Sequence, residues 1–137
     1  MGRVINPESA GKDRNQLVKA IVLALRELAS QQEMNHQTRD LLAFIVLSLE
    51  AVARTIDLSV AAWEKRGYWV KADRFRMEWQ WTKPSAENLR KGLESEDWAA
   101  VAGTIAQVSG RLAHVKVSPR HRMGTPWSGA WQKLALQ

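Results

Sequence analysis

Apolar side chains recur every three or four residues along most of this chain, and this spacing restricts its fold more than any other feature. Between Leu42 and Trp63 apolar positions recur at spacings of three or four residues, which places them on one face of a helix with 3.6 residues per turn. Similar series precede and follow this segment, and no stretch shows the strict alternation of a half-buried strand. The sequence therefore predicts an all-α fold.

Four of these periodic segments are long enough to form helices that pack on one another. A chain of 137 residues has the size of one domain, and short connections between amphipathic helices favour antiparallel neighbours. We therefore expect residues 1–137 to form a single domain, an antiparallel four-helix bundle with a tryptophan-containing C-terminal tail packed on it. The expected helices span roughly residues 8–33, 36–66, 68–94 and 96–116, and the tail spans residues 117–137.

Capping signals mark the ends of these helices. Asp13 precedes Gln16 by three residues and resembles a capping box, although residues 6–7, Asn-Pro, offer an earlier start. Asn35 and Ser95 are suited to cap the second and fourth helices, because their short polar side chains can accept a backbone N–H. Gly67 is suited to end the second helix.

The third segment contains a proline, yet its apolar register continues on both sides of it. Phe75, Trp79, Thr82 and Ala86 keep the helical spacing across Pro84. A proline removes one hydrogen bond and clashes with the carbonyl four residues earlier. We therefore expect a kink or a break between residues 80 and 84, and the unbroken register favours a kink.

The third helix has a second apolar face opposite the one expected to enter the core. Tyr68, Phe75 and Trp79 form the core stripe when the segment is projected on a helix. An opposite face of this kind is covered or marks a contact site, and we consider three covers: the C-terminal tail, a partner protein or second copy of this chain, and nucleic acid. The residues of this face and of the tail that would take part are Val70, Arg74, Met77, Trp81, Trp127 and Trp131.

The second and fourth helices also have additional faces. Phe44, Leu47 and Leu58 line another side of the second helix, so that it is apolar almost all round, and such a helix is usually buried on nearly all sides. Dimerisation would supply that cover, and so would the tail or a kinked third helix wrapping around it. On the fourth helix Gly103 and Gly110 belong to a ridge of small residues, where we expect Trp127 or Trp131, from the same or a second chain, to pack.

Positive charge is concentrated in two parts of the chain. The net charge is +6, and residues 64–91 hold eight Lys and Arg against four Asp and Glu, whereas residues 115–137 hold four against none. Such a surplus favours an anionic partner such as a nucleic-acid backbone. The candidate anion-binding residues are Lys65, Arg66, Lys71, Arg76, Lys83, Arg120 and Arg122.

Sequence motifs that carry chemistry are absent or incomplete. The chain has no cysteine, which excludes disulfides, thiol nucleophiles and cysteine-bound zinc. Glu33 and His36 have the spacing of a di-iron motif, but it occurs once, and residues 9–12, Ser-Ala-Gly-Lys, lack the rest of a phosphate-binding loop. We therefore expect no metal, no cofactor and no catalytic residue.

The same observations favour a cytoplasmic protein. The first residues lack the apolar run of a signal peptide and the Ser or Thr of a myristoylation signal. The most apolar segment, residues 41–63, contains Glu50, Arg54 and Asp57, which are costly in lipid. We expect a core helix there and no contact with a membrane.

Together these features indicate a non-enzymatic binding or assembly module. Its expected partners are a second copy of itself or another protein subunit, with nucleic-acid phosphates as a further contact for the basic residues. The alternative is a homodimeric helical bundle that binds or converts a small ligand between its helices, using Glu50, Arg54 or Trp79 in its interior. A solvent-exposed pair between Glu50 and Arg54, four residues apart on one helix, is the simpler expectation for those two charges.

Overall fold

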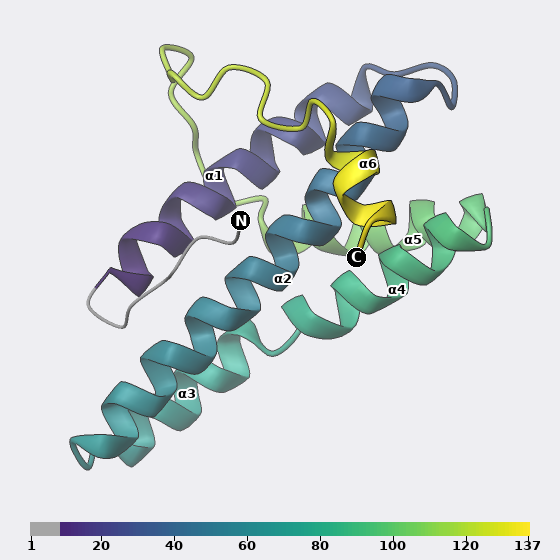
Figure 1. Ribbon diagram of the computed structural model, residues 1–137. Coiled ribbons are helices and arrows are strands. Elements are labelled where there is room, and N and C mark those ends of the chain that lie inside the picture. The colour runs from purple at the N-terminus through teal and green to yellow at the C-terminus, as the bar shows by residue number, and fades with distance from the viewer. Residues whose placement is uncertain (1–8) are drawn as a thin grey trace.

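The computed structural model describes residues 9–137, and that part of the chain is a bundle of helices without strands (Figure 1). The prediction of an all-helical bundle with a packed tail is confirmed. The third predicted helix is divided in two, and the tail contains a short helix. The elements are α1 (Ala10–Ala29), α2 (His36–Lys65), α3 (Trp69–Trp79), α4 (Thr82–Glu94), α5 (Trp98–Arg111) and α6 (Ala130–Ala135).

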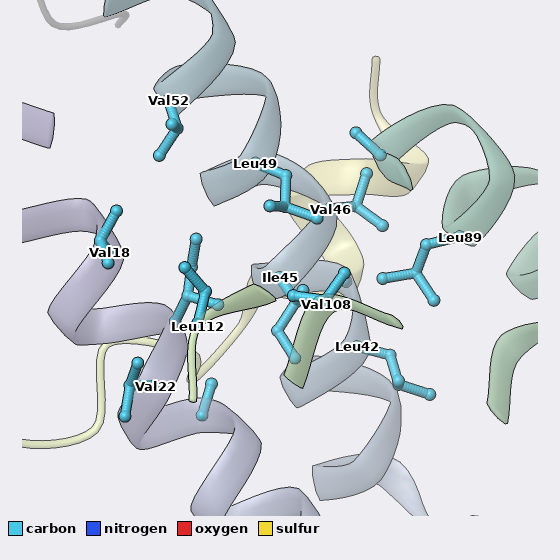
Figure 2. Packing of buried hydrophobic residues seen from close by; sticks show 14 of the residues in the cluster. Val18, Val22, Leu42, Ile45, Val46, Leu49, Val52, Leu89, Val108 and Leu112 are labelled. Carbon is cyan, nitrogen blue, oxygen red and sulfur yellow. The ribbon is translucent and has the colours of Figure 1, made fainter. Parts of the chain in front are cut away.

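The longest helix, α2, is the common packing partner of the others. It contacts α1, α3, α4 and α6, while α5 packs mainly on α4. The core is built around its apolar stripe, where Leu42, Ile45 and Leu49 are fully buried or nearly so, and Val22 of α1 and Val108 of α5 close the cluster (Figure 2). Burying each such side chain stabilises the fold by about 1.5–3 kcal/mol.

The caps predicted for α1 and α2 are confirmed in part. Asn35 caps α2 as predicted, because its side-chain oxygen accepts the Thr38 N–H at 3.0 Å. The capping box predicted at Asp13 is wrong: α1 already begins at Ala10, and Asp13 is a buried residue of its first turn. The alternative start at residues 6–7 lies outside the described residues.

The third predicted helix breaks rather than kinks. Helix α3 ends at Trp79, and α4 begins at Thr82 after two residues that retain helical dihedral angles. Pro84 is the third residue of α4, a position where a missing N–H costs little because the first N–H groups of a helix have no partner within it. The proline is therefore tolerated by starting a new helix, and the axis changes direction there (Figure 1).

A close approach at Gly92 connects α4 to α5. A Cβ at this position would lie 2.8 Å from the Cγ2 atom of Val101, so only glycine lets the two helices pack at this distance. The predicted cap of α5 at Ser95 is wrong, because the Ser95 hydroxyl donates instead to the Lys91 carbonyl at 2.8 Å. Asp97 caps α5 by accepting the Ala100 N–H at 3.1 Å.

The C-terminal tail folds back onto the N-terminal half of α2. Asp40, buried in the first turns of α2, accepts the N–H groups of Gly129 at 3.1 Å and Trp131 at 3.0 Å. Trp127 is buried, and the ring of the half-buried Trp131 lies 5.7 Å from the Arg39 guanidinium. The tail therefore covers the N-terminal half of α2 within one chain.

The half-buried Arg14 ties α1 to α2 and α3. Its guanidinium donates to the Thr55 and Ser59 hydroxyls at 3.4 and 3.3 Å and lies 4.6 Å from the centre of the Phe75 ring. Burial lowers the pKa of Arg14, and the charge of Glu78 partly offsets this effect. Within residues 9–137, no helix combines the length and the apolar character that crossing a membrane would need.

Candidate binding surface on the α2–α3 hairpin

Helices α2 and α3 form a hairpin whose closed end projects beyond the other helices (Figure 1). Gly67 makes the turn with a φ of 82°, a left-handed conformation that glycine adopts without strain. The Gly67 and Tyr68 N–H groups donate to the carbonyls of Glu64 at 3.0 Å and Trp63 at 2.9 Å. These bonds satisfy the last carbonyls of α2 and fix the direction in which α3 leaves the turn.

The inner face of the hairpin is aromatic. Trp63 and Phe75 pack edge to face, with ring centres 4.8 Å apart, and Trp79 continues the row at 6.4 Å from Phe75. Ala72 is fully buried between the helices. The sequence prediction is correct for Phe75 and Trp79, but wrong for Tyr68, which lies at the turn rather than in the core.

The outer face carries the most extensive group of exposed large apolar side chains in the described chain. Tyr68 is 55% exposed, Trp69 59%, Val70 67% and Met77 68%. The predicted cover by the tail is wrong, because Val70 and Met77 remain open while the tail packs at Asp40. We refer to residues 65–74, which include the turn and the first turns of α3, as the hairpin tip.

Four exposed cations belong to the same short segment as the aromatic residues of the hairpin tip. Lys65, Arg66, Lys71 and Arg74 are all exposed, and the Lys71 ammonium lies 4.6 Å from the centre of the Trp63 ring. None of the four forms an ion pair within residues 9–137 of the structure. Their charges are therefore available to an anionic partner.

Arg76, by contrast, is already paired within the hairpin. Its guanidinium donates to Asp73 at 2.6 Å and to Glu64 at 3.0 Å, and these two hydrogen bonds raise its pKa. This exposed network links the two helices. Arg76 is therefore less suited to bind a separate anion than the four cations of the hairpin tip.

The other predicted anion-binding residues lie elsewhere. Lys83 lines a groove between α2 and α4. Arg120 and Arg122 are exposed in the long loop before α6, which Figure 1 shows on the opposite side of the molecule from the hairpin tip. The anion-binding residues predicted in the third helix and in the tail therefore lie apart within one chain.

The remaining predicted interface residues do not all lie on the exposed face of α3 with Val70 and Met77. Arg74 is exposed beside Val70, but the break after Trp79 removes Trp81 from this face. Trp81 instead stacks on Trp79 at 6.3 Å and lies 6.0 Å from the Arg111 guanidinium. The three α2 residues are half-buried, and two of them pack against the core: the set is Phe44, Leu47 and Leu58.

The charges predicted on α2 do not pair with each other. Glu50 forms its ion pair with Arg90 of α4 rather than with Arg54, so the predicted pair four residues apart is wrong. Glu50 and Arg54 both line the groove of about 200 Å³ between α2 and α4 that also contains Lys83. Trp79 lines a different groove, beside α5. The residues proposed for an internal ligand site are thus distributed over two surfaces.

The predicted contact between the tail tryptophans and the small-residue ridge of α5 is also wrong within the chain. A Cβ built on Gly103 or Gly110 would meet no atom within 4 Å. The ridge is exposed, whereas Trp127 and Trp131 pack beside Asp40.

Metal-binding geometry is not found in the described part of the chain. Residues 9–137 contain no group of three or more His, Cys, Asp or Glu side chains that could hold a metal ion. Every buried side-chain nitrogen or oxygen in that range has a hydrogen-bond partner.

No protein family, curated protein or solved structure matches this chain. Sequence analysis did not select Trp69 as an interface residue, and it placed Tyr68 in the core stripe, yet both are exposed. Their position directly after the Gly67 turn was the available signal, since side chains at the end of a projecting hairpin have few neighbours to cover them.

Proposed function

We propose that this protein is a non-enzymatic binding module of nucleoprotein assemblies, and that its hairpin tip binds single-stranded nucleic acid. One observation carries the proposal. The rings of Tyr68 and Trp69 are more than half exposed, and exposed cations precede and follow them in the same short segment. Surfaces that bind single strands combine these two features, aromatic faces for the bases and cations for the phosphates.

The two kinds of side chain would contribute different parts of the affinity. Base stacking on an aromatic ring contributes about 1–3 kcal/mol per base and tolerates any base, since each has a π-face. Cations that meet phosphates release counterions, so binding weakens as salt rises. With four cations engaged, affinity for a single strand should fall roughly 50-fold between about 50 and 200 mM salt.

The charge distribution of α3 favours a nucleic acid over a lipid surface. Val70 and Met77 are the apolar groups that would enter the lipid, but the carboxylates of Asp73 and Glu78 share their short helix. Carboxylates are costly to place in an apolar layer. A flexible single strand can instead approach the rings and cations of the tip and leave these acids in water.

The test is fluorescence anisotropy with a labelled oligothymidylate at about 50 and 200 mM salt. Binding at the lower salt should be lost in Trp69→Ala and strongly reduced in the double variant Lys65→Glu/Lys71→Glu. Both changes lie at exposed positions, so circular dichroism should show an intact fold. The matched control is Lys12→Glu/Lys19→Glu, which makes the same charge change at two exposed positions of α1.

Three outcomes would contradict the proposal. Wild-type protein that does not bind the oligonucleotide at the lower salt would exclude it. An equal loss of binding in the α1 control would show attraction to net charge rather than to the hairpin tip. Binding to vesicles of anionic phospholipid, with the oligonucleotide left unbound, would identify a membrane surface as the partner.

A further inference from the structure

A groove of about 200 Å³ opens where the end of α3 meets the C-terminal end of α5. It combines indole rings with charged side chains, and the residues that line it are Glu78, Trp79, Trp81, Arg111, Leu112 and His114. Glu78 lies on the same side of α3 as Lys71 and Arg74 of the hairpin tip, because spacings of three and four residues bring side chains onto one face of a helix. The groove therefore continues the charged side of the hairpin tip along α3.

The two indole rings form an aromatic wall of this groove. Trp79 and Trp81 are half-buried and pack against the core, and their rings are inclined by 22° with centres 6.3 Å apart. Leu112 is buried beside them. A planar ring that enters the groove can therefore stack on an aromatic face whose position is already set by the packing behind it.

Arg111 lies over the Trp81 ring on the open side of the groove. Its guanidinium is 6.0 Å from the centre of that ring, and its side chain is exposed. A base needs about 3.4 Å on each face to stack, so it fits between ring and guanidinium once Arg111 moves outward by about 1 Å. Arg111 and the exposed His114 then offer N–H donors to the phosphate of the same nucleotide.

Glu78 is the carboxylate among the lining residues. It forms no ion pair within residues 9–137, although its charge acts on Arg14. A carboxylate repels phosphates, but it can accept two parallel hydrogen bonds from a base edge that carries adjacent N–H donors. Among the four bases of DNA only guanine has such a pair, the N1–H and the 2-amino group, whereas adenine has an acceptor nitrogen beside its amino group.

We propose that this groove binds a guanine base, stacked between Trp81 and Arg111, with the Glu78 carboxylate accepting its N1–H and 2-amino groups. The inference rests on the proposed function for the strand that presents the base, since the hairpin tip holds that strand. Trp69 and Glu78 belong to the same helix and are about 14 Å apart along its axis, within reach of a short oligonucleotide. The tip then binds any base, and the groove adds sequence preference.

The same lining residues make other occupants less suited to the groove. A cationic ligand would meet the Arg111 guanidinium. An apolar helix would cover Glu78 and Arg111 without satisfying their charges, which is costly. An inorganic anion would leave both indole rings without a contact. A planar base with a phosphate uses the rings, the carboxylate and the N–H donors together.

Fluorescence anisotropy with three labelled oligonucleotides at about 50 mM salt tests the proposal. Each is an oligothymidylate with one central substitution: guanine, hypoxanthine, which lacks the 2-amino group, or adenine. Wild-type protein should bind the guanine strand at least about fivefold more tightly than the adenine strand, with the hypoxanthine strand between them. Adenine is the matched control for stacking, because its fused ring system has the same size as that of guanine.

Two variants at exposed positions assign the preference to the groove. Glu78→Gln should bring the guanine and adenine strands to similar affinity, because an amide has only one acceptor oxygen for the two donors of guanine. Its matched control is Glu94→Gln, the same change at an exposed position of α4 that does not line the groove. Arg111→Ala should weaken the guanine strand more than unsubstituted oligothymidylate, with Arg26→Ala, at an exposed position of α1, as its control.

The outcomes distinguish this inference from the proposed function. If oligothymidylate binds and the three substituted strands bind equally, the groove does not recognise guanine, and the inference is overturned while the hairpin tip stands. A guanine preference that Glu78→Gln retains would overturn it as well.

If oligothymidylate does not bind, the proposed function fails, and guanosine monophosphate tests the groove by itself. Quenching of tryptophan fluorescence by this nucleotide, absent with adenosine monophosphate and lost in Glu78→Gln, would support the groove as a guanine site. No quenching by guanosine monophosphate would then overturn it.

Discussion

Replacing Asp40 with alanine should release the C-terminal tail from α2. The Asp40 carboxylate is buried and accepts two backbone N–H groups, from Gly129 at 3.1 Å and Trp131 at 3.0 Å. Hydrogen bonds to a charged group contribute about 1.5–3 kcal/mol each, and two on one carboxylate are not additive. Allowing for this, we expect Asp40→Ala to lower the free energy of unfolding by about 2–4 kcal/mol.

Two measurements should show this loss and its location. Denaturant unfolding gives the change in stability, and hydrogen exchange followed by mass spectrometry reports on residues 125–136. Amide exchange there should accelerate strongly in Asp40→Ala, while peptides of α3 change little. Asp40→Asn retains one acceptor oxygen and should fall between the wild type and the alanine variant. Asp57→Ala, an exposed acid on the same helix, is the control and should leave the tail protected.

The reasoning would be refuted by an unchanged exchange pattern. If residues 125–136 stay protected in Asp40→Ala, the tail is held mainly by the burial of Trp127 rather than by the carboxylate. If they exchange freely in the wild type as well, the tail does not dock on α2 in solution.

Four further predictions follow from local geometry. Gly92→Ala should destabilise the fold by about 1–2 kcal/mol through its clash with Val101, whereas Gly103→Ala, in open space, should stabilise the monomer by up to about 1 kcal/mol; thermal unfolding compares the two. Asn35→Ala and Asp97→Ala each remove a helix cap and should each cost about 1 kcal/mol in urea unfolding. Arg14→Lys should lower the free energy of unfolding at neutral pH, because burial lowers the pKa of a cation at this site. The folded state then binds the proton less tightly than the unfolded state, so this loss of stability should shrink as pH rises towards about 10 in urea unfolding at several pH values. Removing Lys71 alone should reduce the slope of log affinity for oligothymidylate against log salt by about 0.7.

The local part of the fold could be predicted from the sequence. Helical periodicity placed the helices, and Asn35 and Gly67 marked ends of helices because caps act on residues within one turn of themselves. The cap predicted at Ser95 is wrong because Asp97, two residues later, is an equally good cap. The kink favoured at Pro84 is wrong because a continuing apolar register is compatible with two helices as well as with one kinked helix.

Contacts between distant segments could not be predicted in this way. Glu50 has Arg54 one turn away, but Arg90 of α4 forms the ion pair. Asp40 occupies a position in α2 without any local sign that residues 89 and 91 positions later donate to it. Local spacing fixes the face of a helix on which a residue lies, but not which other helix covers that face.

The candidate site shows the same division. The sequence identified the segment with crowded aromatic and basic residues, and Val70, Arg74 and Met77 are exposed. It did not separate Arg76, which is paired, from the cations of the segment that are unpaired within residues 9–137, because the Arg76 partners Glu64 and Asp73 come together only when the hairpin closes. Nor did it select Trp69, whose exposure depends on how far the hairpin projects from α1.

The attachment of the tail to Asp40 also bears on how the protein forms during synthesis. The N-terminal half of α2 leaves the ribosome well before the residues that cover it, because Gly129 follows Asp40 by 89 positions. Until those residues follow, this part of α2 keeps apolar surface exposed, and a non-local closure of this kind is slow. Translation that stops short of Trp127 would therefore leave the N-terminal half of α2 partly uncovered and raise the tendency of the product to aggregate.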